Sequence, residues 1–262
     1  MAVTHCIFCG YQLLPAGQNL PHSRTSEHIF ASWFRSLSDH KTISMYLGSA
    51  SATAPQLERR PTLTRLVMKG VCRKCNNGWM SSLETAVEPV MRRVFAGTDV
   101  DRLPPAELET LARWTAKTAI TLSYATPQHA SVPLLASRSL HPADHGPRRF
   151  AFFYSKISAD GPLDNGHLQV GYGAEIPLVG TNEVSGTRLV LGLNGHCLVV
   201  DFPPLPGVQF NLSQSCSAEL WPVRKPAGTR KLSIATPART DQVLLAICQA
   251  ISVEIDPASL RV

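Results

Sequence analysis

The stretch "VCRKCNNGWM", Val71–Met80, packs two cysteines, two cations, two asparagines and a tryptophan into ten positions. Its Cys-x-x-Cys spacing is repeated near the N-terminus in "CIFCG". Two such pairs separated by a loop are the usual source of a tetrahedral site in which four thiolates hold Zn²⁺. We therefore predict a structural zinc whose ligands are Cys6, Cys9, Cys72 and Cys75.

This zinc is expected to fold the chain and to take no part in a reaction, because four thiolates leave no open coordination position. Binding both cysteine pairs to one ion would also bring two other segments together. One is Glu27-His28, which lies between the pairs, and the other is Asn76-Asn77, which directly follows the second pair. Side chains that could carry a reaction are therefore predicted to gather beside the zinc.

Length and composition indicate a globular protein without a membrane span. The 262 residues suffice for one large or two modest domains, and 44% of them are hydrophobic. No apolar run approaches the roughly 20 residues of a membrane helix, and no export signal is visible at the N-terminus. The cysteines number seven, which argues against a disulfide framework. We predict a cytoplasmic protein.

The positive charge is concentrated in the part of the chain that carries the cysteine pairs. Residues 1–100 contain eleven Lys/Arg against six Asp/Glu, whereas residues 101–262 contain fourteen against thirteen. A basic excess of this kind favours a polyanionic partner such as nucleic acid. Four cations in and near the second cysteine pair are predicted to contact phosphates. They are Arg65, Lys69, Arg73 and Lys74.

Helical and strand-like patterns occur in both halves of the chain, which predicts an α+β fold. We expect residues 1–100 to form a zinc-bound module and residues 101–262 to form an α+β domain of unassigned role. The patterns in that domain predict helices over about 104–140, strands over about 149–235 and a closing helix over about 240–254.

Four shorter segments carry local predictions of their own. "IFASWFRSL", residues 29–37, has helical spacing. The small and polar stretch 48–61 predicts an exposed loop. A second helix is expected over about 79–95. Asn194-Gly195 between two apolar runs predicts a β-hairpin.

Three motifs taken together resemble the HNH endonucleases, the ββα-metal nucleases of the type held by a four-cysteine zinc. The motifs are a Cys-x-x-Cys, an acid-His-Ile and a Cys-x-x-Cys-Asn. They are matched by Cys6 and Cys9, by Glu27-His28-Ile29, and by Cys72, Cys75 and Asn76. The resemblance covers about the first third of the chain, and it implies a zinc-stabilised ββα-metal (HNH) module.

The resemblance also implies roles for individual residues. His28 would be the general base, and Glu27 and Asn76 would hold a catalytic Mg²⁺ or Mn²⁺. Asn77 would either share that ligand role or cap the helix that starts there. The chemistry fits these roles, because a neutral imidazole activates water near pH 7 and oxygen ligands suit Mg²⁺ or Mn²⁺. The implied substrate is nucleic acid, with double-stranded DNA favoured.

The sequence departs from the family at one functional position. The family often has an asparagine that orients the base, whereas this chain has no asparagine between His28 and Cys75. What would orient His28 is therefore left unassigned by the sequence.

Two alternative functions stay open. A non-catalytic zinc ribbon that binds nucleic acid or protein would account for the cysteines and the charge, but it leaves Glu27, His28 and Asn76 without a role. A thiol redox protein fits poorly, because no βαβ pattern accompanies the Cys-x-x-Cys pairs. Residues 101–262 could in either case bind a protein partner or mediate self-association.

Overall fold

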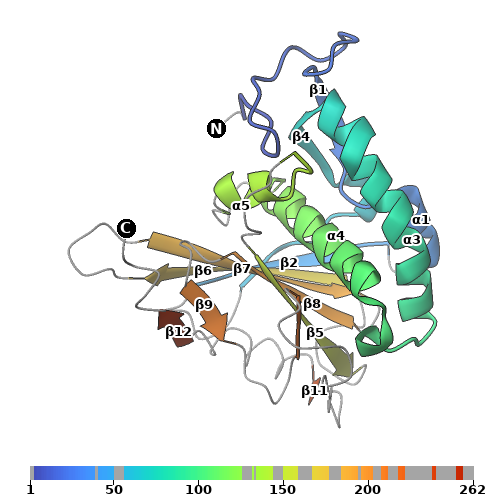
Figure 1. Cartoon of the computed structure of the whole chain (residues 1–262), viewed down its shortest axis with the longest axis vertical. Helices are drawn as coiled ribbons and strands as arrows, with labels where there is room; N and C mark the ends of the chain where they lie inside the picture. Colours follow the sequence, from blue (N-terminus) through green and yellow to red (C-terminus); the bar gives the residue numbers. More distant parts are fainter. Residues whose placement is uncertain are drawn as a thin grey trace.

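Helices and strands are mixed in an α+β arrangement, as predicted (Figure 1). The structure is a computed structural model. It describes residues 3–38, 41–49, 56–125, 132, 134–143, 150–158, 167–176, 184–193, 196–202, 208–211, 218–221, 238–239 and 252–255.

The helices lie mainly in the first half of the chain and the long strands in the second half. The helices are α1 (Ser32–Leu37), α2 (Arg73–Cys75), α3 (Ser81–Phe95), α4 (Pro105–Tyr124) and α5 (Leu134–Ser139), with the short turns η1 (Leu63–Arg65), η2 (Asn76–Met80) and η3 (Val100–Arg102). The strands are β1 (Arg24–His28), β2 (Ile43–Ser49), β3 (Gln56–Arg59), β4 (Val67–Cys72), β5 (Ala151–Ser158), β6 (His167–Ile176), β7 (Val184–Leu193), β8 (His196–Phe202), β9 (Val208–Asn211), β10 (Ala218–Trp221), β11 (Ala238–Arg239) and β12 (Ser252–Ile255).

A sheet of eight strands forms the base of the molecule. Its strand order is β10-β5-β8-β7-β6-β2-β3, and β11 pairs with β5. β7 and β8 pair antiparallel with Leu193 opposite His196, which confirms the hairpin predicted at Asn194-Gly195. The turn residues themselves lie outside the described residues.

Two strands of this sheet come from the first hundred residues. β2 pairs in parallel with β6, and β3 pairs with β2. The sheet therefore joins the two regions that the sequence suggested were separate. The exposed loop predicted over 48–61 is wrong at residues 48–49, which end β2, and at residues 56–59, which form β3, whereas residues 60–61 lie outside any helix or strand. Residues 50–55 of that prediction lie outside the described residues.

One buried ion pair links the middle of this sheet. Arg188 and Asp201 lie opposite each other on β7 and β8, and each is about 1% exposed. Arg188 donates from Nε to Oδ1 at 2.6 Å and from Nη2 to Oδ2 at 2.7 Å. Burial raises the pKa of Asp201, and the neighbouring guanidinium opposes that rise. The two-fold hydrogen bonding offsets the cost of removing both charges from water.

α4 lies between the sheet and the rest of the N-terminal region (Figure 1). It contacts β7, β8 and β10 of the sheet, and it also contacts α3 and β4. The helix is consequently buried on all sides over most of its length, as expected for a helix enclosed by other elements. Proline at its first position and Glu107 in its first turn are typical helix-opening residues.

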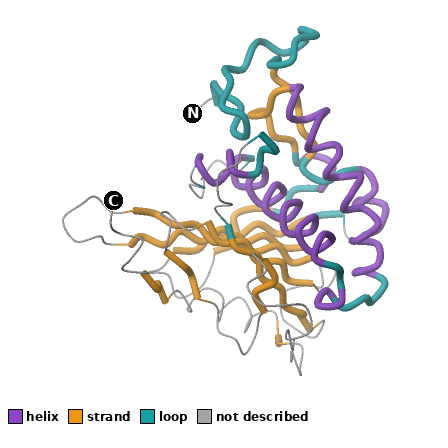
Figure 2. The backbone as a smooth tube through the Cα atoms, in the orientation of Figure 1, coloured by secondary structure: helices purple, strands orange, loops and turns teal. Residues whose placement is uncertain are grey.

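A small strand-strand-helix unit carries the second cysteine pair. β1 and β4 form an antiparallel two-stranded ribbon with Thr25 opposite Val71 and His28 opposite Val67. α2, η2 and α3 follow β4 directly, and the loops of residues 3–23 lie beside the ribbon (Figure 2). The helix predicted over 79–95 is confirmed as α3. The helix predicted over 29–37 is shorter than expected, since α1 begins at Ser32.

The end of the chain differs from the prediction. The closing helix expected over 240–254 lies mostly outside the described residues, and its last residues, 252–254, belong to the strand β12. β12 pairs antiparallel with β9, so these residues take their conformation from a partner strand far away in sequence. Among the described residues, no helix is long and apolar enough to cross a membrane.

Candidate functional site

The four predicted cysteines come together in the structure. The Sγ atoms of Cys6, Cys9, Cys72 and Cys75 lie within 4.8 Å of one another, and none of these cysteines forms a disulfide. With Zn–S bonds of about 2.3 Å, a tetrahedral site requires sulfurs about 3.8 Å apart. Cys9 Sγ and Cys72 Sγ are 3.7 Å apart. The cluster could therefore hold a metal ion such as zinc.

Backbone hydrogen bonds shape the first cysteine turn. Gly10 donates its N–H to the carbonyl of Cys6 at 2.8 Å, and the N–H of Cys72 points to Cys6 Sγ at 3.5 Å. Gly10 has φ of 75°, a conformation that favours glycine. A β-carbon at this position would also lie 3.0 Å from the guanidinium of Arg138, which α5 presents to the turn. The positive φ is therefore the main reason for glycine at this position, because the flexible Arg138 side chain could move away from a β-carbon.

The electrostatics of the four thiols favour a bound cation. Hydrogen bonds from Cys72 and Cys75 hold the pKa of Cys6 far below that of an ordinary thiol. The hydrogen bond to Cys6 raises the pKa of Cys75, and burial raises the pKa of Cys9 to about 12. Without a metal, ionisation of one thiol therefore opposes ionisation of its neighbours, so the four cysteines cannot all become thiolates. A divalent cation removes this conflict, because it stabilises every thiolate that binds it.

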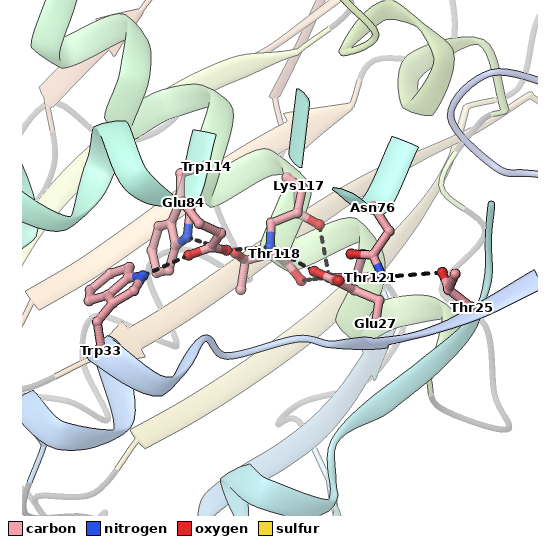
Figure 3. Close-up of polar contacts among 9 residues, drawn as sticks. All are labelled: Thr25, Glu27, Trp33, Asn76, Glu84, Trp114, Lys117, Thr118 and Thr121. Atoms are coloured by element: carbon pink, nitrogen blue, oxygen red, sulfur yellow. Dashed lines mark hydrogen bonds and ion pairs between the residues drawn. The ribbon is translucent and has the colours of Figure 1, made fainter. Parts of the chain in front are cut away.

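Glu27 and Asn76, the predicted ligands of a second metal, are connected through the strand β1. Glu27 is on β1 and only 7% exposed, and Asn76 is half-buried at the start of η2. Asn76 donates from Nδ2 to Thr25 Oγ1 at 3.1 Å. In Figure 3 the carboxylate of Glu27 and the amide oxygen of Asn76 point toward one another. The strand and the helix start are thus joined through Thr25.

A buried charged cluster continues from Glu27 into the helices (Figure 3). Lys117 of α4 is fully buried, and its Nζ lies 3.4 Å from Glu27 Oε1 and 2.5 Å from Glu84 Oε1. Glu84 also accepts hydrogen bonds from the indole N–H groups of Trp114 and Trp33, each at 3.0 Å. These contacts fix Glu84, and Glu84 in turn fixes Lys117.

Two acidic side chains and one basic side chain meet in this cluster. Burial raises the pKa of Glu27, and Lys117 opposes that rise. Burial also lowers the pKa of Lys117, but Glu84 and Glu27 more than offset this, so its pKa is raised and the ammonium stays charged. Two carboxyl groups share one ammonium.

We expect Lys117→Met to destabilise the protein by about 3–5 kcal/mol, because it leaves Glu27 and Glu84 buried without a cation. Methionine keeps most of the side-chain volume, so the loss would reflect the charge. Chemical denaturation measures the effect. Lys69→Met is the matched control, since Lys69 is exposed and its replacement should change stability little. A loss in Lys117→Met no larger than in the control would contradict this account of the cluster.

His28 lies at the solvent-exposed end of β1. Successive residues of a strand point to opposite faces, so buried Glu27 and exposed His28 occupy opposite sides of the ribbon. The two are nevertheless close enough for the charge of His28 to lower the pKa of Glu27. Within the described part of the chain, the His28 ring makes no hydrogen bond. Among the described residues, none therefore replaces the orienting asparagine that the resemblance implies.

The four cations that are predicted to contact phosphates differ in their exposure to solvent. Arg65, Lys69 and Lys74 are exposed, whereas Arg73 is half-buried and donates from Nη1 to Asn19 Oδ1 at 2.9 Å. Lys69 lies two residues beyond Val67, the register partner of His28, and so shares the exposed face of the ribbon with His28.

Asn77 does not cap a helix. It is exposed within η2, whose preceding residue is Cys75, and α3 begins after Met80 with no side-chain cap. Gly78 interrupts the helical conformation with φ of −95° and ψ of −113°, and among the described residues the Asn77 side chain makes no capping hydrogen bond on either side of this kink, so the capping alternative is wrong. The ligand alternative for Asn77 stays a prediction.

Sequence reasoning missed Thr25, Glu84 and Lys117. Lys117 did leave a signal, because it is a single cation in the apolar run "TAKTAI" of a helix. A charged residue at such a position must find a buried partner. Thr25 and Glu84 left no comparable signal.

No protein-family model, curated protein or solved structure matches the chain.

Proposed function

We propose that this protein is a metal-dependent endonuclease of the HNH type, which hydrolyses phosphodiester bonds in nucleic acid, with double-stranded DNA favoured. The observation that carries the proposal is that Asn76, which directly follows the four-cysteine cluster, is hydrogen-bonded to Thr25 on the strand that bears Glu27. The antiparallel β1–β4 ribbon with α2, η2 and α3 after it supports the proposal as well, because a unit of two strands and a helix is what the resemblance implies, although α1, β2 and β3 lie between these strands in the sequence.

Each of the two side chains keeps one oxygen uncommitted. Glu27 accepts from Lys117 through Oε1, and Oε2 has no hydrogen-bond partner among the described residues. Asn76 uses Nδ2 for Thr25, which leaves Oδ1 uncommitted within the same part of the chain. One carboxylate oxygen and one amide oxygen form a donor set that suits Mg²⁺ or Mn²⁺. The residues therefore fit the metal that the resemblance implies.

The proposed roles follow from the chemistry of each side chain. Glu27 and Asn76 bind the cation, which polarises the phosphoryl oxygen and stabilises the leaving oxygen. His28 accepts the proton of the attacking water, for which a neutral imidazole is suited near pH 7. Its exposed position at the end of β1 leaves it accessible to a large substrate. The four cysteines, through the structural zinc, keep β1 and η2 in a fixed arrangement.

The charge around the zinc ligands supports a polyanionic substrate. Residues 3–26 and 60–83 together contain six Lys/Arg and no Asp/Glu. Both segments surround the ribbon that bears His28, and Lys69 lies on the same exposed face. Lys and Arg side chains without neighbouring acids attract phosphates, and their binding releases the counterions that surround the nucleic acid. Because phosphate contacts carry no sequence information, this surface would bind nucleic acid without regard to sequence.

The charge reversal Arg73→Glu with Lys74→Glu should weaken binding to all DNA sequences by a similar factor. Each lost phosphate contact lowers the slope of log K against log salt by about 0.9, so two contacts would lower it by about 2. Fluorescence anisotropy at several salt concentrations measures this slope. The matched control is Arg92→Glu with Arg102→Glu, which changes the charge equally outside the acid-free segments. If both double variants lose binding equally, the cations beside the second cysteine pair have no special role.

The direct test of the proposal is cleavage of supercoiled plasmid by purified wild-type protein. We expect nicked and linear products with Mg²⁺ or Mn²⁺ and none with EDTA added shortly before the reaction. Circular dichroism in the same EDTA buffer controls for loss of the structural metal. Absence of metal-dependent cleavage of both DNA and RNA would overturn the proposal.

A non-catalytic zinc ribbon is the second candidate. One observation favours it: the His28 ring has no hydrogen bond that would orient a general base within the described residues. This candidate predicts nucleic-acid binding without cleavage. Self-association or a protein partner through residues 101–262 is compatible with both candidates, and light scattering of the purified protein would test self-association.

A further inference from the structure

The hydroxyl of Thr25 has a single proton, and the structure shows where that proton goes. Thr25 lies opposite Val71 in the β1–β4 ribbon, and its Oγ1 donates to the Val71 carbonyl at 3.1 Å. A carbonyl oxygen can only accept, so this contact requires the Thr25 proton. The hydroxyl is therefore left with lone pairs alone for any other neighbour.

This constraint determines how the Asn76 amide is turned. Asn76 lies 3.1 Å from Thr25 Oγ1, and only its NH₂ group can donate to a hydroxyl whose proton is already used. The opposite orientation would place two oxygens in contact without a proton between them. The amide oxygen must therefore face away from Thr25. In Figure 3 it faces the carboxylate of Glu27.

We propose that Thr25 is a positioning residue for the cation site, in that its hydroxyl keeps the amide oxygen of Asn76 directed toward Glu27. The inference rests on the proposed function. Thr25 touches neither the substrate nor the cation in this proposal, and it acts through Asn76 alone. Lys117 restrains Glu27 in a corresponding way, because it occupies Oε1 and leaves Oε2 uncommitted.

The alternative is that Thr25 only ties the ribbon to the start of η2. Replacement would then lower stability and leave cation binding unchanged in the folded protein. Two substitutions separate these readings. Thr25→Val keeps the shape and strand preference of the side chain but removes the hydroxyl, whereas Thr25→Ser keeps the hydroxyl and removes a methyl group.

The experiment is a calorimetric titration of Mn²⁺ alone into zinc-loaded protein, together with cleavage assays at increasing Mn²⁺. We expect Thr25→Val to raise the Mn²⁺ dissociation constant by about 10–100-fold, the usual effect of removing a partner of a metal ligand. Cleavage at saturating Mn²⁺ should recover most of the wild-type rate. Thr25→Ser should bind Mn²⁺ like wild type, and thermal unfolding should show all three proteins folded.

The outcomes are distinct. If Thr25→Val binds Mn²⁺ as tightly as wild type does, the positioning role of Thr25 is overturned and the proposed function still stands. Equal weakening in the serine and valine variants would show that any change at position 25 disturbs cation binding and that the hydroxyl has no specific role, which also overturns the inference. Wild type that binds no Mn²⁺ would overturn the cation site itself, and the Thr25 inference with it.

Discussion

Cys72→Ser is expected to yield protein without zinc that is insoluble or unfolded. Cys72 is fully buried and is the last residue of β4, where it joins the ribbon to the helical turns. Binding of a structural zinc provides folding free energy of order 10 kcal/mol in small metal-bound modules. That loss is comparable with the entire stability of an ordinary domain. Elemental analysis and the soluble fraction on expression measure the two effects.

Wild type is expected to contain one zinc per chain and to retain it through dialysis against dilute EDTA. The matched control is Cys197→Ser, since Cys197 is also fully buried but lies on β8, outside the cluster. This control should lose some stability and keep its zinc. Soluble, folded wild type that contains no zinc would contradict the structural-metal account.

His28→Ala is expected to lower the rate of cleavage by a factor of order 10²–10⁴, the usual contribution of a general base. His28 is exposed and makes no hydrogen bond within the described residues, so its removal should leave the fold and the zinc content unchanged. Binding of DNA should also be retained, because the phosphate contacts remain. Single-turnover cleavage of supercoiled plasmid, with anisotropy for binding, separates these effects.

Substitutions at the proposed ligands should behave differently from His28→Ala. Glu27→Ala and Asn76→Ala each remove an oxygen that binds the cation, so activity should recover in part at higher Mg²⁺ or Mn²⁺. His28→Ala should show no such recovery. His5→Ala, an exposed histidine next to the first cysteine pair, is the matched control and should cleave like wild type. If His28→Ala also cleaves like wild type, the non-catalytic zinc ribbon becomes the better account.

The four-cysteine cluster could be predicted from the sequence because its chemistry is local. A Cys-x-x-Cys spacing places two sulfurs on one side of an ion whatever the rest of the chain does. The positive φ of Gly10 follows from the same tight turn. The hairpin at Asn194-Gly195 was predictable for a similar reason, since two residues suffice to specify that turn.

Longer-range features were beyond the sequence. β2 and β3 belong to a sheet whose other strands begin at residue 151, and no local pattern specifies a partner that far away. The loop predicted over 48–61 was wrong at residues 48–49 and 56–59 for this reason. Residues 252–254 were likewise expected to be helical, and their pairing with β9 makes them a strand. Strand preference depends strongly on such partners.

The sequence by itself determined the cysteine cluster, the basic character of the segments around it and the adjacent residues Glu27, His28 and Asn76. Only the tertiary structure decided which of these residues have partners. Packing of α4 against the ribbon and α3 brings Lys117 to Glu27, ninety residues away in the sequence. Pairing of β1 with β4 places the Val71 carbonyl where the Thr25 hydroxyl donates its hydrogen bond to it. The Asn76 amide must then donate to Thr25 through its NH₂ group. These contacts depend on which elements pack together, and short-range spacing carries no information about them.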